Sequence, residues 1–100
     1  MRARFLKPAG AEVDEAIAYF DEQRESLGAR FEEDLLNTVR LVTDHPFAGK
    51  LLTDSVRKFR FRRFRYNLIY VVDGDEILIV AVAHHSRRPG YWRGRLSGFN

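Results

Sequence analysis

The sequence predicts an α+β fold: an N-terminal strand, a helical hairpin and an antiparallel β-meander, in the order β-α-α-β-β-β, with the helices on one face of a twisted sheet. Apolar residues recur at intervals of three and four up to position 42, and at intervals near two from position 56. The segment Asp73-Gly74-Asp75 separates two apolar runs and is a strong hairpin signal. A chain of 100 residues forms one domain, so we expect a single domain over residues 1–100.

The first half of the chain predicts a short strand and two helices. Residues 1–7 are expected to form the strand, and Pro8 to end it. The first helix has an apolar stripe that one face can bury, formed by Val13, Ile17, Phe20, Arg24 and Leu27. Gly28 is expected to break this pattern and join the two helices in an αα-hairpin. The second helix presents Phe31, Leu35, Leu36, Val39 and Val42, and His45-Pro46 ends it because proline disfavours a helical residue before it.

The second half predicts three strands. The first runs from Val56 to Tyr66, with phenylalanines on one face and basic residues on the other. Residues 67–72 and 76–84 form the other two, and the last is apolar on both faces, which marks a central strand. The helical hairpin would cover one face of this sheet. No element remains to cover the other apolar face fully, so an exposed groove for a partner is expected there.

The net charge of +3 hides an asymmetry between the two halves. Residues 1–54 hold 7 Lys and Arg against 11 Asp and Glu, whereas residues 55–100 hold 10 against 3. A basic patch of this kind meets nucleic acid or an acidic protein, unless it is only a solvated surface. We expect some strand arginines to pair with helix carboxylates, and Glu32, Glu33 and Asp34 to form a solvated helix face.

Cations, imidazoles and aromatics gather in the segment that ends the last strand, residues 84–93. The side chains expected to contact a target are Arg60, Arg62, His85, Arg87, Arg88, Tyr91, Trp92 and Arg93. His85 is favoured over His84, which is expected to bond to backbone, because the two point to opposite faces and an unperturbed histidine titrates near neutrality. Tyr91 and Trp92 could stack on a base or pack the tail against the sheet.

The composition argues against several other classes of protein. The chain has no cysteine, and its three histidines lack a carboxylate at ligand spacing, so neither a metal site nor a cofactor is expected. It has no apolar run long enough to cross a bilayer, no apolar leader and no amphipathic membrane helix. We therefore expect a cytoplasmic protein without a membrane partner.

These residues resemble the RelE/ParE superfamily, the toxins of bacterial type II toxin–antitoxin modules. The resemblance covers nearly the whole chain and depends on the order and spacing of four segments: Leu27–Phe31, Pro46–Gly49, Phe64–Tyr70 and His84–Trp92. It implies a twisted antiparallel sheet with two helices packed on it. It also implies a cognate antitoxin, ParD-like in this case, whose C-terminal segment wraps the toxin and neutralises it.

Two activities follow from the resemblance: ParE-like members bind and poison DNA gyrase, and RelE-like members cleave mRNA on the ribosome. For a metal-independent ribonuclease, the resemblance assigns the catalytic roles to Lys58, Arg60 and Tyr91, with either His85 or Arg87 in a nearby polar role. However, Asn67 stands where RelE-like chains carry an arginine, and losing one such cation costs roughly a few kcal/mol of transition-state stabilisation. We therefore favour the ParE-like toxin, which needs a binding surface and no catalytic set. The alternatives are the mRNA endonuclease and a non-toxic relative that only binds an antitoxin.

Overall fold

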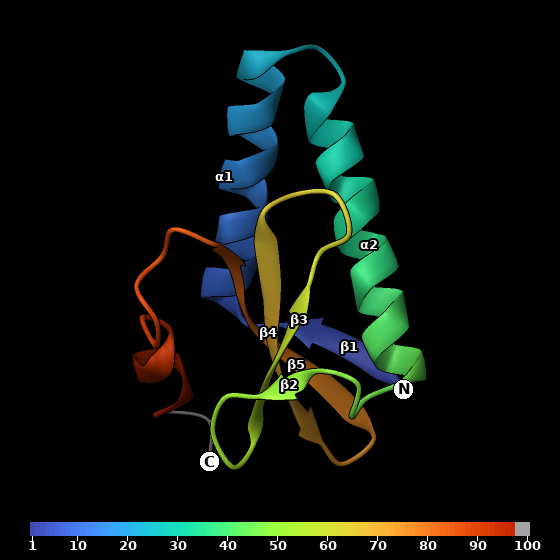
Figure 1. The fold of residues 1–100 in the computed structure, drawn as a ribbon, viewed down its shortest axis with the longest axis vertical. Helices are drawn as coiled ribbons and strands as arrows, with labels where there is room; N and C mark the ends of the chain where they lie inside the picture. The colour runs from blue at the N-terminus through green and yellow to red at the C-terminus, as the bar shows by residue number, and fades with distance from the viewer. Residues whose placement is uncertain (98–100) are drawn as a thin grey trace.

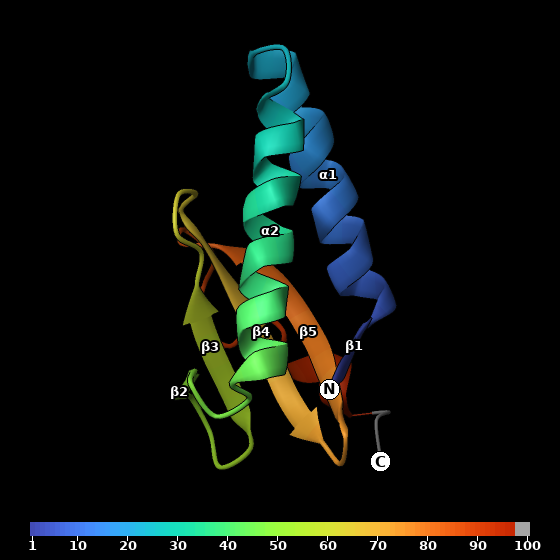
Figure 2. The same ribbon diagram turned by 90° about the vertical axis from the view of Figure 1, so that its right-hand side faces the viewer.

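The computed structural model describes residues 1–97 and has an α+β architecture (Figure 1). In chain order its elements are β1 (Arg2–Phe5), α1 (Lys7–Gln23), α2 (Leu27–Asp44), β2 (Lys50–Leu51), β3 (Val56–Arg60), β4 (Tyr66–Asp73), β5 (Glu76–His84) and the short 3-10 helix η1 (Arg93–Leu96). The five strands form one sheet in the order β1-β5-β4-β3-β2. Both helices lie on one face of this sheet and extend past its end (Figure 2). Among residues 1–97, no helix is long and apolar enough to cross a membrane.

The predicted boundaries of the helices need two corrections. Pro8 lies in the first turn of α1 and does not end the strand before it, because the first turn of a helix has backbone N–H groups without partners and tolerates proline. The joint of the hairpin lies at residues 24–26, where Ser26 adopts a left-handed conformation with φ of 70°. Arg24 and Leu27 therefore lie outside α1, and Leu36, predicted to be buried, is 52% exposed on α2.

Gly28 lies inside α2 and is buried against α1. A Cβ atom at this position would lie 2.6 Å from a carboxylate oxygen of Asp21 and 2.7 Å from the carbonyl oxygen of Ile17. The Gly28 N–H donates to Asp21 Oδ1 at 2.9 Å. Gly28 is therefore needed for the close approach of the two helices, and not for a break between them.

The meander of β3, β4 and β5 is antiparallel as predicted, but the sheet as a whole is mixed. β1 pairs in parallel with β5, with Arg2 opposite Glu76. The helical hairpin separates β1 from the meander, so no tight turn fixes their relative direction. Two further details differ from prediction: β2 lies in a segment expected to be loop, and residues 61–65, expected to continue β3, form the turn between β3 and β4. β5 has the predicted bounds and the predicted interior place, and residues 77–83 are all buried.

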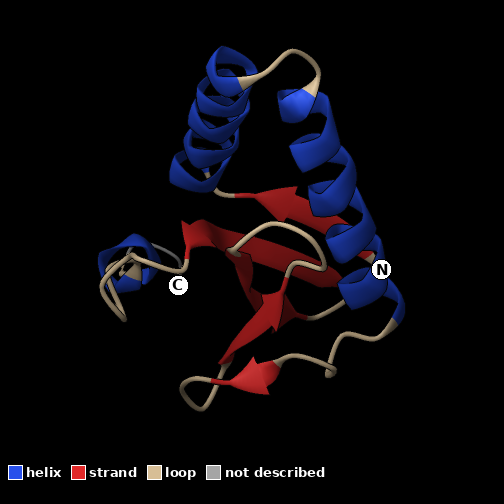
Figure 3. Cartoon of the chain, turned by 45° about the horizontal axis from the view of Figure 1, so that its top comes forward, coloured by secondary structure: helices blue, strands red, loops and turns tan. Residues whose placement is uncertain are grey.

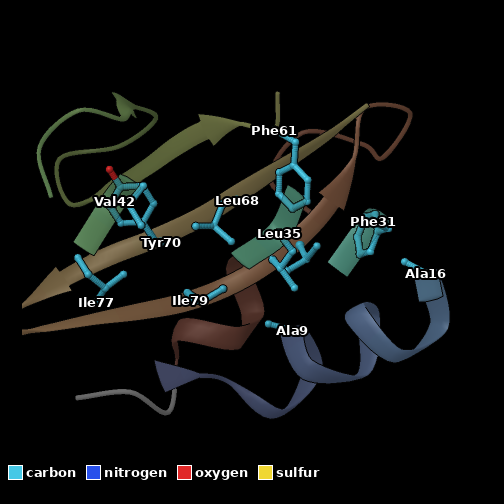
Figure 4. Close-up of a cluster of buried hydrophobic side chains, with 11 residues drawn as sticks. Ala9, Ala16, Phe31, Leu35, Val42, Phe61, Leu68, Tyr70, Ile77 and Ile79 are labelled. Carbon is cyan, nitrogen blue, oxygen red and sulfur yellow. The ribbon is translucent and has the colours of Figure 1, made fainter. Parts of the chain in front are cut away.

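The main core lies between the helices and the sheet (Figure 4). It contains Ala9, Ala16, Phe31, Leu35, Val42, Phe61, Leu68, Tyr70, Ile77, Ile79 and Val82. A register shift in the β4–β5 pair places Ile69 opposite Ala81 and Tyr70 opposite Ile79, which leaves Val80 as an extra residue. Val80 and Ala81 therefore both belong to the cluster on the opposite face, and the alternation reverses after them.

The apolar cluster on the second sheet face is largely covered, so the groove expected there is reduced to a cleft beside the covering segment. We refer to residues 85–97 as the C-terminal tail. The tail folds back along this face, and Figure 3 shows it in tan and blue beside the red strands. Trp92, only 4% exposed, packs in a cluster with Val56, Ile69, Val71, Leu78, Val80, Ala81 and Ala83. The packing of Trp92 on the sheet confirms one of the two alternatives considered for it, although the tail has no helical or strand periodicity from which its path could be predicted.

Candidate functional site

The tail and the ends of the central strands enclose a cleft of about 350 Å³. Seven of the candidate side chains line it: Lys58, His85, Arg87, Arg88, Tyr91, Trp92 and Arg93. Asn67 lines it too and contributes a neutral amide. The structure therefore brings these seven candidates together into one basic cleft, whose lining comes from β3, β4, β5 and the tail.

Arg60 and Arg62 border a different cleft. This second cleft, about 510 Å³, lies between α2 and the turn that joins β3 to β4. It is lined by Glu33, Asp34, Asn37, Thr38, Arg40, Leu41, Asp44, Phe59, Arg60, Arg62 and Arg63. The predicted contact residues are thus divided between two separate clefts, which share no lining residue.

A carboxylate that sequence analysis did not single out holds the tail in place. Glu12 of α1 accepts hydrogen bonds from Arg95 Nη1 at 2.8 Å, Arg95 Nη2 at 3.1 Å and the Tyr91 hydroxyl at 2.5 Å. It also accepts the backbone N–H of Val82 at 3.0 Å. The ladder between β1 and β5 ends at Phe5 and Ile79, so this part of β5 has no neighbouring strand on that side. Glu12 therefore satisfies an otherwise unpaired strand N–H and links α1, β5 and the tail.

The charges around Glu12 keep it ionised. Burial by itself would raise the pKa of Glu12, but hydrogen bonds from Arg95, Tyr91 and Val82 outweigh burial and lower that pKa below its ordinary value. The Glu12 side chain is 11% exposed and that of Arg95 is 18% exposed, so the pair is largely removed from water. Arg87 Nη2 lies 3.7 Å from Glu12 Oε2 and adds a weaker attraction.

Tyr91 is a structural donor in this arrangement. Burial, followed by its hydrogen bond to Glu12, raises the pKa of the Tyr91 hydroxyl well above its usual value. The guanidinium carbons of Arg87 and Arg95 lie 4.4 Å and 5.1 Å from the centre of its ring. A hydroxyl fixed in this way, with its proton directed at a carboxylate, is poorly suited to exchange protons with a substrate.

The two histidines at the end of β5 have separate environments. The His84 Nδ1 accepts the backbone N–H of Ser86 at 3.0 Å, which confirms the predicted backbone bond. His85 is exposed on the basic side, and its pKa is lowered by burial and then by the nearby charge of Arg60. Arg65 contributes to the same repulsion. The charges of Arg60 and Arg65 therefore add to the effect of burial in disfavouring the protonated form of His85.

The turn between β3 and β4 is held by a second carboxylate, whose observed role differs from the predicted one. Asp34 was expected on a solvated helix face, yet it is 4% exposed. Its Oδ2 accepts the backbone N–H groups of Arg63 and Phe64, each at 2.9 Å. The charge therefore fixes the turn that carries the arginines. Its partners are about thirty residues away in sequence, so helix periodicity gives no sign of it.

We expected some strand arginines to pair with helix carboxylates, and among residues 1–97 they do not. Within residues 1–97, the ion pairs are Arg4 with Glu76, and Arg87 and Arg95 with Glu12. The two ion pairs that reach a helix carboxylate, those of Arg87 and Arg95 with Glu12, therefore both come from the tail. Arg57 instead donates to the carbonyl oxygens of Phe47 and Gly49. The other basic residues of this region are exposed and make none of these ion pairs: Arg60, Arg62, Arg63 and Arg65.

The geometry of the tail settles how its aromatic residues pack. Trp92 is buried against the sheet and Tyr91 is bonded to Glu12, so both pack the tail in place. Gly90 permits this path, because it adopts φ of 77° and a Cβ there would meet Arg93 Nε at 2.6 Å. The arrangement presents a dense set of cations and two exposed imidazoles, those of His84 and His85, on a rigid support. It can bind an anionic surface without further chemistry.

Comparisons with known proteins agree with this fold. The family model of the ParE toxin of type II toxin-antitoxin system, parDE, matches residues 3–89. A solved structure described as the chromosomal ParDE TA system from P. aeruginosa is similar, with a TM-score of 0.73 at 18% identity over 84% of this chain and 95% of that chain. The isolated E. coli RelE toxin has a TM-score of 0.48 at 17% identity, with 93% of each chain covered. No curated protein matches the sequence. Because the family model spans most of the described structure, the chain belongs to the ParE toxin family of type II toxin–antitoxin systems.

Proposed function

We propose that this toxin inhibits growth by binding and poisoning DNA gyrase in the cytoplasm, and that a cognate ParD-like antitoxin neutralises it. The family match carries the proposal, since it covers both helices and nearly all of the five-stranded sheet. The basic cleft supports it, because its cations lie on a fixed scaffold and suit an anionic partner surface.

The arrangement of the cleft favours binding over catalysis. RNA cleavage without a metal needs a base, an acid and cations on the phosphorane. Asn67 brings no charge to the cleft, and the Tyr91 hydroxyl is committed to Glu12. Trp92, which could have stacked on a base, is buried.

A ribosome-dependent mRNA endonuclease is the second candidate function. Lys58, His85 and Arg87 line one cleft, and a neutral imidazole beside cations is one arrangement that general base catalysis uses. This function predicts codon-positioned cuts that disappear when Lys58 or His85 is replaced. A third candidate, a non-toxic relative that only binds an antitoxin, predicts normal growth when the chain is expressed alone.

The direct test of the target is gyrase supercoiling with purified components. The wild-type chain should block conversion of relaxed plasmid to the supercoiled form at near-stoichiometric amounts. The variant R88Q/R93Q removes two exposed cations of the basic cleft that make no ion pair among residues 1–97, and it should inhibit more weakly. The control R2Q/K7Q removes the same charge from exposed positions outside both clefts and should inhibit like the wild type. Unaffected gyrase at stoichiometric excess of wild-type chain contradicts the proposal.

The antitoxin is tested separately. Co-expression with the small protein encoded beside this gene should restore growth, and the two should co-purify as a heteromer. A toxin that stays monomeric and has no affinity for its neighbour counts against that part of the proposal.

A further inference from the structure

We propose that the arginine turn, residues 60–65 with Arg60, Arg62, Arg63 and Arg65, is a binding surface for the phosphate backbone of double-stranded DNA. The inference rests on the proposed function, because gyrase acts on DNA, and it adds a direct contact between toxin and DNA. Figure 2 shows the turn at the end of the sheet opposite the β4–β5 turn, clear of both termini.

The first support is uncompensated charge. Four exposed guanidinium groups lie within six consecutive residues. None is within 4.0 Å of a carboxylate oxygen in residues 1–97, where only Arg4, Arg87 and Arg95 form ion pairs. The acidic groups that face the turn from α2 are Glu33, Asp34 and Asp44, and Asp34 is bonded to backbone N–H groups. The arginines therefore keep their donors free for a ligand.

The second support is the field that these arginines create at a neighbour. The His85 backbone N–H donates to the Arg65 carbonyl at 2.9 Å, so the end of β5 adjoins the turn. The pKa of His85 is lowered, by burial first and then by Arg60, with a further contribution from Arg65. Burial is the larger cause, but Arg60 and Arg65 lie close enough to His85 to disfavour its protonated form, and the same positive charges would attract phosphate.

The third support is that the turn is already rigid. Asp34 holds the backbone of Arg63 and Phe64. Within the turn, Phe61 N–H donates to the Tyr66 carbonyl at 2.9 Å and Tyr66 N–H donates to the Phe64 carbonyl at 2.8 Å. A ligand would therefore order side chains only, which lowers the entropic cost of binding.

The side chains between the arginines favour a nucleic acid over a protein. A protein interface normally has an apolar centre. Here the two phenylalanines point inward: Phe61 is 2% exposed, and the ring of Phe64 packs 4.9 Å from that of Phe20. No residue of the turn is an exposed large hydrophobic. Cations without an apolar centre suit a phosphate backbone, whose contacts are mostly polar and electrostatic.

The same inward packing favours a duplex over a single strand. Proteins that bind single-stranded nucleic acid stack bases on exposed aromatic rings. Phe61 is buried and Phe64 packs against the main core, so neither offers its ring to solvent in this way. The surface can therefore grip a backbone but provides no platform for unpaired bases.

The test measures binding of the chain alone to a labelled DNA duplex of about 20 base pairs. Fluorescence anisotropy reports the bound fraction at several salt concentrations. The variant R62Q/R63Q/R65Q should bind about tenfold more weakly or worse at low salt. The slope of log K against log salt should become shallower by about 0.9 for each phosphate that the variant no longer neutralises. The control R2Q/K7Q/K50Q removes three exposed charges from outside the turn and should keep most of the affinity and slope. Unchanged emission from Trp92, the single tryptophan, verifies that each variant is folded.

Three outcomes overturn the inference. Equal weakening in both triple variants would mean that only net charge matters. Tighter binding to a single strand of the same length would identify the wrong nucleic acid. Loss of gyrase inhibition by R62Q/R63Q/R65Q with unchanged duplex binding would assign the turn to a protein contact.

Failure of the inference can be told apart from failure of the proposed function. A wild-type chain that inhibits gyrase but does not bind duplex refutes the DNA contact and leaves the target intact. A chain that binds duplex through the turn without inhibiting gyrase supports the surface and refutes the target.

Discussion

Replacing Glu12 by glutamine should release the C-terminal tail from the sheet. The substitution keeps the shape of the side chain and one carbonyl oxygen, so the Val82 N–H can still find an acceptor. It removes the negative charge and places an NH₂ group where Oε2 accepts from Arg95 and Tyr91. Arg95 then keeps its charge, largely out of water, without a counter-ion.

The size of the effect follows from the contacts. Removing one partner of a buried ion pair costs about 3–5 kcal/mol, because the remaining charge stays desolvated. The side chains of Glu12 and Arg95 are 11% and 18% exposed, so some water can reach them. Arg95 also keeps its bond to the Val80 carbonyl at 3.1 Å. We therefore expect Glu12→Gln to lower the free energy of unfolding by about 2–4 kcal/mol.

Two measurements test this prediction. Urea unfolding gives the loss of stability, and Trp92 emission in native buffer reports docking of the tail, because this single tryptophan is 4% exposed. Emission should shift to the red as Trp92 leaves the sheet. A double-mutant cycle with Arg95→Met should show that the two effects are strongly coupled. A loss under about 0.5 kcal/mol with unshifted emission would refute the role of Glu12.

Four further predictions rest on single contacts. Asp34→Ala leaves two backbone N–H groups of the arginine turn without an acceptor and should cost about 2–4 kcal/mol in urea unfolding, whereas Asp34→Asn should cost less; equal losses would contradict this. Tyr70→Phe removes a buried hydroxyl that accepts the Gly49 N–H, and calorimetry should show a loss of about 1–3 kcal/mol, with an unchanged melting temperature as the contrary result. Gly28→Ala should destabilise by about 1–3 kcal/mol because its Cβ would press on α1, and an equally stable variant would refute the close packing. The pKa of Glu12 is lowered on folding, so its contribution to stability should be complete above the unfolded pKa of 4.5 and be lost as pH falls through the folded pKa. Trp92 emission followed during an acid titration tests this, and emission that does not shift before the whole chain unfolds would contradict it.

The elements that the sequence predicts best are those with strong local periodicity. β5 was predicted with the right bounds because residues 77–83 are apolar on both faces, which only an interior strand can bury. The hairpin turn follows from Gly74, which adopts φ of 62°. The errors lie where local pattern competes with tertiary contact. Gly28 looks like a helix breaker, and only the neighbouring helix reveals why a glycine is required.

Residue type alone led to seven candidates that the structure brings together in one cleft, and residues that act over long sequence distances were missed. Seven cleft residues were found because cations and aromatics cluster between residues 84 and 93 and on the basic strand. Glu12 and Asp34 look like ordinary acidic residues of amphipathic helices. Their partners lie about seventy to eighty and about thirty residues away, respectively, so no local signal distinguishes them. The extent to which the tail covers the second sheet face was not predicted for the same reason, because the tail has no periodic pattern.

The measurement that tests the central claim most directly is induction of this chain without its antitoxin in bacteria, with mapping of ribosome-bound transcripts and a reporter of DNA damage. A toxin that poisons gyrase predicts growth arrest with intact transcripts and a strong DNA-damage response. Discrete, codon-positioned cuts in the transcripts without DNA damage would contradict the account and assign the basic cleft to RNA cleavage.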